Sequence, residues 1–168
     1  HIGAFTVACG RQLDTGHVYA FEPCPDNYAL LAENVRRNCP ETVTLSPRAV
    51  ADRADTRTLF LDGENSGGHS LLAFGRGGPT AMVQTVAFGD LLEAIARPVD
   101  ILKIDAEGSE YDMLFPAADL LRQRVDHIVM EAHASGRRRP AELVRLLGDL
   151  GYAVRTEGSD RLMLIFAD

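Results

Sequence analysis

Three carboxylates follow a short apolar run near the middle of the chain, and their types and spacing favour chemistry. The run, residues 101–104, is interrupted only by Lys103 and is followed by Asp105, Glu107 and Glu110. An apolar run of this length before a helical pattern predicts a buried parallel strand that enters a helix. Ligands of open α/β sheets bind at the carboxyl ends of such strands. Asp105 is therefore a candidate for both catalysis and cofactor binding.

Glu107 and Glu110 have the spacing of two residues on one face of a helix. Since they are three positions apart, we expect them to share the first turn of the helix that follows Asp105. A carboxylate near a helix N-terminus also stabilises the helix by about 0.3–1 kcal/mol, which is a structural reason for both acids. We take Glu107 as a further candidate catalytic residue and leave both interpretations open for Glu110.

Glu131 and His133 come at the end of the next predicted strand, residues 126–130. Side chains alternate along a strand, so these two residues point to the same side. Neighbouring strands lie about 5 Å apart, which predicts that Asp105, Glu131 and His133 share one pocket. A carboxylate beside an imidazole orients a general base or holds a divalent cation, and the sequence leaves a metal undecided. A solvated loop position is the alternative interpretation of His133.

Glu22 follows another β-rich run, residues 17–21. In nucleotide-binding α/β folds an acid at this point accepts hydrogen bonds from ribose hydroxyls. Gly3 precedes it by about twenty residues, in a predicted turn before a helix, where a glycine lets the backbone approach a ligand. We therefore expect Gly3 and Glu22 to bind a nucleoside-containing cofactor.

Asp52 lies just past the apolar residues 49–51. A carboxylate at this point can accept a hydrogen bond from an adenine amino group, which makes Asp52 a candidate cofactor-binding residue. An acid in a polar surface loop is the alternative interpretation.

The elements that must position these residues alternate between strands and helices. Pro116 is expected to end or kink one of the helices, and residues 49–51 to continue the strand before them. Hydrophobic periodicity predicts helices at residues 2–13, 26–38, 90–96, 109–124 and 140–150, and strands at 17–21, 42–45, 56–61, 81–86, 101–104, 126–130, 152–156 and 161–166.

This order predicts a single α/β domain over residues 1–168, with a Rossmann-like, mostly parallel sheet and an antiparallel last strand. Residues 56–86 are expected to form an inserted β-hairpin with a long glycine-rich loop. The first strand of such a fold would precede His1. We therefore expect an apolar strand, an acid and a glycine-containing turn upstream of the sequence.

Composition restricts the classes of partner. The 17 Lys and Arg residues against 24 Asp and Glu give a formal charge of -7, which argues against a nucleic-acid partner. The three cysteines, an odd number, show no CxxC spacing, and this favours a reducing, cytoplasmic compartment over a disulfide framework or a zinc site. No run of residues is long and apolar enough to predict a membrane span. The sequence leaves the oligomeric state undecided.

With these residues in place, the chain resembles the FkbM-type methyltransferases, a branch of the class I fold that uses S-adenosylmethionine. His1-Ile2-Gly3-Ala4-Phe5-Thr6 is similar to the second half of the family's cofactor turn. Further similarity lies in Val18-Tyr19-Ala20-Phe21-Glu22-Pro23-Cys24-Pro25 with Asn34 and Asn38, in Leu102-Lys103-Ile104-Asp105-Ala106-Glu107-Gly108-Ser109-Glu110, in the loop from Ser66 to Leu72, and in Glu131-x-His133.

The resemblance implies methyl transfer from S-adenosylmethionine to an oxygen, with a small-molecule or sugar hydroxyl as acceptor. On this interpretation Glu22 holds the ribose and Gly3 lies beside the methionine moiety. Asp105, Glu131 and His133 then orient and deprotonate the acceptor. Two alternatives stay open: an NAD(P)-dependent oxidoreductase, which also places a strand-end acid on ribose, and a catalytically silent methyltransferase-like binding module.

Overall fold

The computed structural model describes residues 1–73 and 78–168. The chain forms two compact units, and each is described by itself. As far as the chain is described, the first unit comprises residues 1–50, 55–69 and 78–85, and the second comprises residues 51–54, 70–73 and 86–168. The single methyltransferase domain over residues 1–168 therefore stays a prediction.

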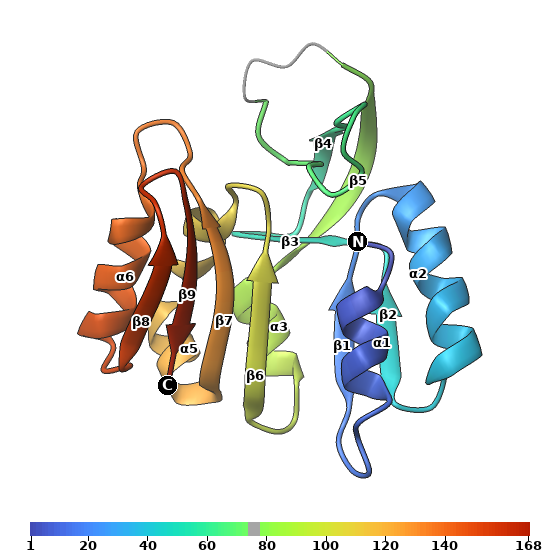
Figure 1. Ribbon diagram of the computed structural model, residues 1–168, viewed down its shortest axis with the longest axis horizontal. Helices are drawn as coiled ribbons and strands as arrows, with labels where there is room; N and C mark the ends of the chain where they lie inside the picture. Colours follow the sequence, from blue (N-terminus) through green and yellow to red (C-terminus); the bar gives the residue numbers. More distant parts are fainter. Residues whose placement is uncertain (74–77) are drawn as a thin grey trace. The chain divides into compact units, whose positions relative to one another are not determined.

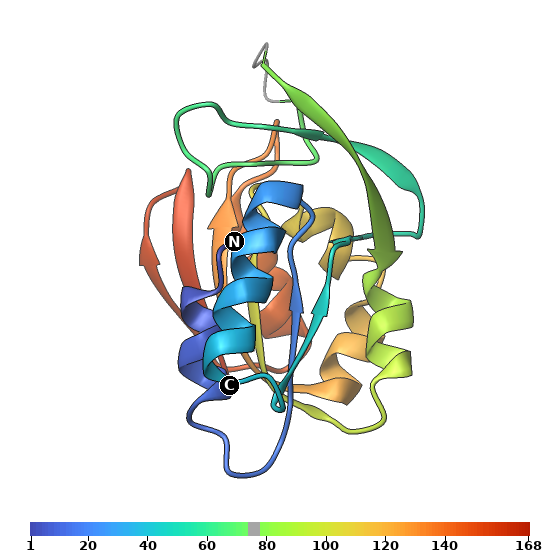
Figure 2. The same ribbon diagram turned by 90° about the vertical axis from the view of Figure 1, so that its right-hand side faces the viewer.

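A helix–strand–helix–strand segment opens the first unit, and it ends in a parallel strand pair. The side chains of α1 and α2 pack with those of the strands in one apolar cluster that includes Leu31, Val35 and Val43. Both helices thus cover the same face of the β1-β2 pair (Figure 2). The elements are α1 (Ala4–Gly10), β1 (Val18–Phe21), α2 (Pro25–Asn38) and β2 (Val43–Ser46), with β1 and β2 in parallel register from Val18↔Val43 to Phe21↔Ser46.

A separate three-stranded sheet follows, with strand order β3-β5-β4. It consists of β3 (Ala49–Ala51), β4 (Thr56–Phe60) and β5 (Thr80–Ala87), and β4 pairs antiparallel with β5. The expectation that residues 49–51 continue the preceding strand is wrong, because β2 ends at Ser46 and β3 belongs to this second sheet. Pro47 interrupts the chain between them, and proline cannot donate to a strand ladder.

The glycine-rich segment between β4 and β5 is fastened by polar contacts inside the first unit. Asp62 Oδ1 accepts hydrogen bonds from the backbone N–H groups of Glu64 and Asn65, at 2.9 and 3.0 Å. Asn27 Nδ2, from α2, donates to the carbonyl oxygen of Ser66 at 2.8 Å. The part of the expected long loop at residues 74–77 lies outside the described residues.

The second unit is built around a mixed four-stranded sheet with strand order β6-β7-β9-β8 (Figure 1). β6 and β7 are parallel, whereas β9 runs antiparallel to both β7 and β8. The expected antiparallel closing strand is confirmed, and it lies inside the sheet rather than at its edge. The elements are α3 (Phe88–Ala94), β6 (Val99–Asp105), α4 (Glu110–Leu114), α5 (Ala118–Arg124), β7 (Val125–His133), α6 (Pro140–Asp149), β8 (Val154–Gly158) and β9 (Leu162–Ala167).

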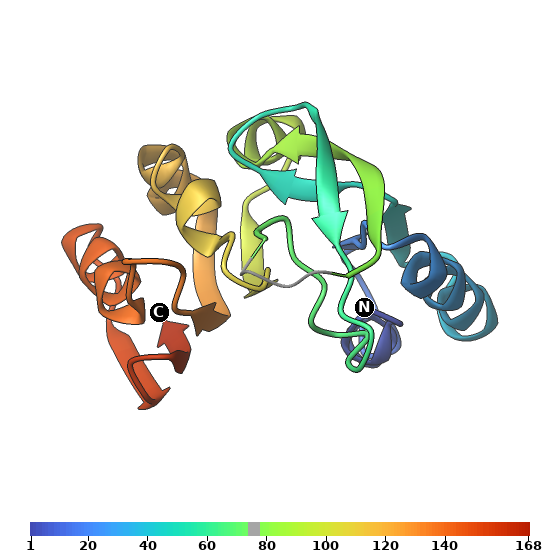
Figure 3. The ribbon, with the colours of Figure 1, turned by 90° about the horizontal axis from the view of Figure 1, so that it is seen from above.

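Helices α5 and α6 lie on one side of this sheet (Figure 3). The residues of β7 that face them, Ile128, Met130 and Ala132, are buried, and they alternate with the residues that carry the candidate site. Pro116 separates α4 from α5, as the sequence predicts. No helix among the described residues combines the length and apolarity that a bilayer crossing needs.

Candidate active site

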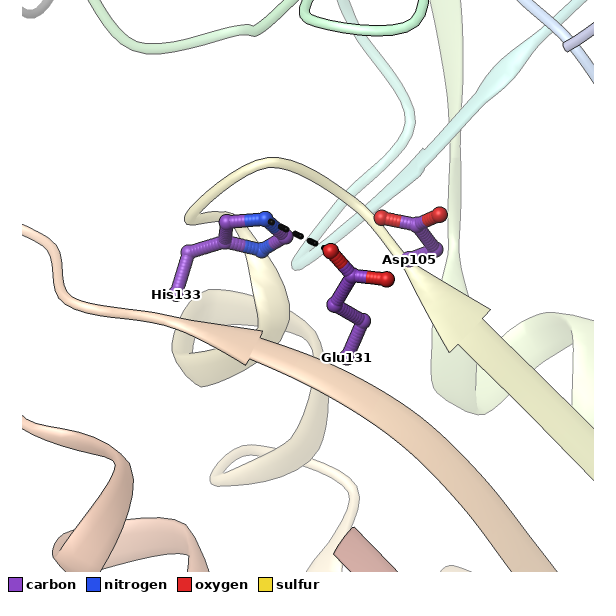
Figure 4. A group of neighbouring side chains, drawn as sticks. All are labelled: Asp105, Glu131 and His133. Carbon is purple, nitrogen blue, oxygen red and sulfur yellow. Dashed lines mark ion pairs between the residues drawn. The ribbon is translucent and has the colours of Figure 1, made fainter. Parts of the chain in front are cut away.

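The pairing of two parallel strands brings three of the sequence-predicted residues together. Asp105 is the last residue of β6 and stands opposite Glu131 of β7 in the parallel register. His133 ends β7 two residues later, so its side chain points to the same side as that of Glu131. Figure 4 shows the imidazole facing the Glu131 carboxylate, with Asp105 on the other side of that carboxylate. The expected shared position of Asp105, Glu131 and His133 is thus observed in the second unit.

The two ring nitrogens of His133 face different carboxylates. Nδ1 lies 3.0 Å from Oε1 of Glu110, a side chain that is completely buried. Nε2 lies 3.6 Å from Oε2 of Glu107 and 3.7 Å from Oε1 of Glu131, both of which are partly exposed. The imidazole therefore has a buried, hydrogen-bonded side and a side that is open to a ligand.

Glu107 reaches His133 from a turn and not from a helix. The expectation that Glu107 and Glu110 share a helical turn is wrong, because α4 begins at Glu110. Glu107 has φ 47° and Gly108 has φ 95°, so two successive residues adopt the left-handed conformation before the helix starts. This conformation is unfavourable for a residue with a Cβ, and the surrounding structure must hold it.

Ser70 holds that turn in place within the second unit. Its hydroxyl donates to the carbonyl oxygen of Glu107 at 2.7 Å and accepts from the backbone N–H of Leu72 at 3.0 Å. Ser70 is only 4% exposed, so the bond is shielded from water. Ser70 lies in the loop from Ser66 to Leu72 that resembles the FkbM-type family, but the sequence does not single out this residue. No local pattern relates a serine in a glycine-rich loop to Glu107, 37 positions away.

The charges around the site are mixed. Lys103 Nζ lies 3.3 Å from Oδ2 of Asp105 and places a cation beside the carboxylates. Asp105, Glu131 and His133 each offer one nitrogen or oxygen atom, and these atoms lie within 4.8 Å of one another. This spacing is one at which a divalent cation can be shared by oxygen and nitrogen donors, so the geometry permits both a base and a metal.

Neighbouring acids shift the titration of His133. Burial alone lowers the pKa of an imidazole, but the hydrogen bond to Glu110 and the negative charges of Glu110, Glu107 and Asp105 outweigh it, so the pKa of His133 is raised. Burial also raises the pKa of Glu107, partly opposed by His133, and the other acids add to the rise. His133 therefore keeps its proton to a higher pH than an isolated imidazole does, and Glu107 to a higher pH than an isolated carboxyl does.

Tyr111 supports the same strand end from α4. Its hydroxyl donates to the carbonyl oxygen of His133 at 2.9 Å. Burial, together with the charges of Glu110 and Glu142, raises the pKa of Tyr111 to about 12, so the phenol keeps its proton at any ordinary pH. The tyrosine was not singled out from the sequence, where it is one apolar position of a helical pattern.

The two expected cofactor residues Gly3 and Glu22 both lie in the first unit. Oε1 of Glu22 accepts a hydrogen bond of 2.7 Å from the backbone N–H of Cys24, and Oε2 contacts the backbone nitrogen of His1. A carboxylate can accept about four hydrogen bonds, so Glu22 keeps acceptor capacity for two ribose hydroxyls. A Cβ on Gly3 would lie 2.7 Å from Cδ1 of Leu31, and the residue has φ 97°. The positive φ favours glycine at this position, and a Cβ would also force the Leu31 side chain to shift.

Asp52, the third expected cofactor residue, follows β3. Its Oδ2 lies 3.3 Å from Nη1 of Arg53, and the side chain is 29% exposed. The contact fits an acid at the surface of a loop as well as it fits a ligand-binding acid. The role of Asp52 stays a prediction.

The α/β fold with its mixed sheet is that of a class of methyltransferases. Residues 1–154 match the methyltransferase FkbM domain, and the chain belongs to that family. The resemblance seen in the sequence is thereby confirmed.

A curated relative is the hexuronic acid methyltransferase AglP of Haloferax volcanii, which is 25% identical to this chain over 151 residues. The match covers 89% of this chain and 59% of the relative, so the chain spans well under two thirds of the relative's length.

Two solved structures show the same fold. The methyltransferase FkbM of Methylobacillus flagellatus KT has a TM-score of 0.59 and 15% identity, over 90% of this chain and 36% of that protein. The precorrin-6y C5,15-methyltransferase of Geobacter metallireducens GS-15 has a TM-score of 0.58 and 16% identity, over 99% of this chain and 74% of that protein. At such identities the likeness establishes the Rossmann-like methyltransferase fold.

Proposed function

We propose that this chain transfers a methyl group from S-adenosylmethionine to a hydroxyl oxygen of a small-molecule or sugar acceptor, with His133 as the general base. The observation that carries the proposal is the pair of contacts on the imidazole. Nδ1 is bound to a buried carboxylate, while Nε2 faces the partly exposed acids Glu107 and Glu131. A base needs such an arrangement, with one nitrogen fixed and the other free to take a proton.

Methyl transfer to an alcohol oxygen requires a base. An alcohol oxygen attacks the methyl carbon of the sulfonium in line, the C–S bond breaks, and the hydroxyl proton must leave. Positioned acid–base catalysis contributes about 10²–10⁴-fold to such a step. Nε2 of His133 accepts the proton, while Asp105 and Glu131 accept hydrogen bonds from the acceptor and hold its hydroxyl in place.

A polyhydroxylated acceptor suits the acids that surround Nε2. Carboxylates accept hydrogen bonds from vicinal hydroxyls, and Lys103 beside Asp105 adds a cationic donor. The relative AglP is named for a hexuronic acid, which carries both hydroxyls and a carboxylate. We therefore place a sugar, and a hexuronic acid in particular, first among the acceptors.

The cofactor belongs to the proposal as well. Glu22 and Gly3 have the character that an adenosyl group requires, since one is an acceptor-only side chain and the other permits close backbone approach. Asp52 and Asp105, which belong to the second unit, stay proposed cofactor-binding residues on the basis of the sequence. A cytoplasmic location is part of the same proposal and rests on the cysteine usage of the sequence.

Steady-state transfer of a labelled methyl group from S-adenosylmethionine to glucuronic acid tests the proposal. We expect His133→Gln to lower kcat by about 10²-fold or more, and Asp105→Asn and Glu131→Gln to raise KM for the acceptor. His127→Gln is the matched control, because His127 lies on the same strand, is exposed and bonds Asp168. Full activity in the first three variants would remove the proposal.

The alternatives differ in the ligand that they predict. In a thermal-shift measurement, S-adenosylhomocysteine should stabilise the protein and NAD should not. Stabilisation by S-adenosylhomocysteine without methyl transfer to any of a panel of hydroxylated compounds would favour the silent binding module.

A further inference from the structure

Glu110 is a buried acid to which the proposed reaction assigns no role. It is the first residue of α4 and has 0% exposure. Burial of a charged carboxylate is costly unless its oxygens are bonded, so such a residue calls for an explanation. A role as a favourable charge at a helix N-terminus does not require burial, because exposed acids serve that purpose equally well.

The contacts of Glu110 are concentrated on one oxygen. Oε1 accepts from the backbone N–H of Ala106 at 3.2 Å and lies 3.0 Å from Nδ1 of His133. Oε2 is buried, and no described residue supplies a hydrogen-bond partner for it. The carboxylate is therefore buried with only one of its two oxygens hydrogen-bonded. This points to the two hydrogen bonds of Oε1 as the reason for its position.

An ionised carboxylate only accepts hydrogen bonds, so opposite an ionised Glu110 it is Nδ1 of His133 that carries the hydrogen. In the neutral ring Nε2 then holds the lone pair, and this is the nitrogen that faces Glu107 and Glu131. The opposite tautomer would place the lone pair of Nδ1 against the carboxylate and would leave Nε2 unable to accept a proton.

We propose that Glu110 is a positioning residue that holds His133 in the Nδ1–H tautomer and so directs the Nε2 lone pair to the acceptor hydroxyl. The inference rests on the proposed role of His133 as base. Glu110 itself is completely buried, so an acceptor that binds at the exposed side of the ring does not touch it. The backbone of His133 is held by Tyr111, whose hydroxyl donates to the His133 carbonyl oxygen, so the contact of Glu110 with His133 is with the ring and not with the backbone of that residue.

Two substitutions of similar size separate these roles. Glu110→Gln keeps a carbonyl oxygen that can accept from both Nδ1–H and Ala106 N–H, whereas Glu110→Met fills the space and accepts nothing. Asp112→Asn is the control for charge on the same helix, because Asp112 is about half exposed and its nearest ion-pair partner is Arg138, at 3.8 Å. Circular dichroism confirms that each variant is folded before it is used.

The first measurement is the tautomer of His133 from ring ¹⁵N chemical shifts at alkaline pH, with the spectrum of His133→Gln for assignment. We expect Nδ1–H in the wild type, in Glu110→Gln and in Asp112→Asn, and a mixture or Nε2–H in Glu110→Met. An Nε2–H tautomer in the wild type, or an unchanged tautomer in Glu110→Met, would overturn the inference. The wild-type spectrum alone can do so, even where Glu110→Met fails to fold.

The second measurement is methyl transfer to glucuronic acid. Glu110→Met should lose about 10²-fold in kcat, the size of a lost general base, with KM for S-adenosylmethionine unchanged, and Glu110→Gln should restore most of it. Wild-type kcat in folded Glu110→Met would also overturn the inference. If the wild type shows the Nδ1–H tautomer but transfers no methyl group, the proposed function fails and the positioning of the ring stands. If it is active with the Nε2–H tautomer, the positioning fails and the function stands.

Discussion

The hydroxyl of Ser70 donates a 2.7 Å hydrogen bond to the carbonyl oxygen of Glu107. This bond joins the end of the glycine-rich segment to the turn that follows β6, and both partners belong to the second unit. It connects a loop residue with the conformation that aims the Glu107 carboxylate at His133. Ser70 is thus a structural part of the site in the second unit.

Removal of that hydroxyl should be costly. Ser70→Ala leaves a buried carbonyl without its donor, and we expect a loss of about 1–3 kcal/mol in the free energy of unfolding. Urea titration measures it, with Ser159→Ala as the control, since Ser159 is exposed and should change stability by less than about 0.5 kcal/mol. Equal midpoints for the two variants would show that the Ser70 bond contributes nothing.

Gly3→Ala should destabilise the first unit. The new Cβ would lie 2.7 Å from Leu31 Cδ1, and the alanine backbone would have to keep φ 97°. Strain of this kind costs about 1–3 kcal/mol. Gly63→Ala is the matched control, because nothing lies within 4 Å of a Cβ at that position. We expect the melting temperature to fall clearly for Gly3→Ala only. A fall of the same size in both variants would contradict the explanation.

The raised pKa of His133 predicts in which direction the stability of the fold changes with pH. Because the folded pKa lies above the unfolded value of 6.5, the protonated ring stabilises the fold fully below about pH 6.5, and this contribution is lost as pH rises through the folded pKa. The stability advantage of the wild type over His133→Gln should therefore shrink on alkalisation. Denaturation at several pH values measures it, and an advantage that grows with pH would show that the sign is wrong.

The same shift sets the acid limb of the rate profile. If neutral His133 is the base, kcat/KM should rise with pH through an apparent pKa above 6.5. A profile that is flat from about pH 6 to pH 9 would argue that no group of this kind limits the reaction.

Glu22 should control cofactor affinity. Glu22→Gln removes the charge-assisted acceptor proposed for the ribose, and we expect S-adenosylhomocysteine to bind about 10- to 100-fold more weakly, equivalent to about 1.5–3 kcal/mol. Calorimetric titration measures it. Glu33→Gln is the control, since Glu33 is exposed on α2 and pairs with Arg36 and Arg37. Unchanged affinity in folded Glu22→Gln would exclude the ribose assignment.

Chelation distinguishes a base from a metal at the strand ends. If Nε2 of His133 accepts the proton, methyl transfer should persist after treatment with EDTA, because a nitrogen that binds a cation has no lone pair left for a proton. Loss of activity that added Mg²⁺ or Mn²⁺ restores would replace the base assignment with a metal shared by Asp105, Glu131 and His133.

Much of the second unit follows from local signals in the sequence. The apolar run before Asp105 and the β-rich residues before Glu131 gave two strands whose parallel register places these acids opposite each other. The helix is interrupted at Pro116, because proline has no N–H to donate and its ring clashes with the preceding turn. These features depend on periodicity and on single residues with fixed backbone properties, which a sequence displays directly.

The remainder depends on contacts between distant residues. β3 joins β5 and not β2, and Glu107 leaves the expected helix for a left-handed turn held by Ser70. The choice of a strand's partner depends on which side chains pack together, and no local pattern near Ala49 contains that information. The tautomer of His133 is likewise set by a buried carboxylate 23 positions away.

The place of β9 within its sheet affects how the protein is made. β9 is synthesised after β7 and β8 but separates them in the folded sheet. While the ribosome is still translating, β7 therefore presents an unpaired edge, and such edges invite association with other chains. Nascent molecules stalled before β9 has left the exit tunnel should engage chaperones more than those stalled after β9 (Leu162–Ala167) has emerged.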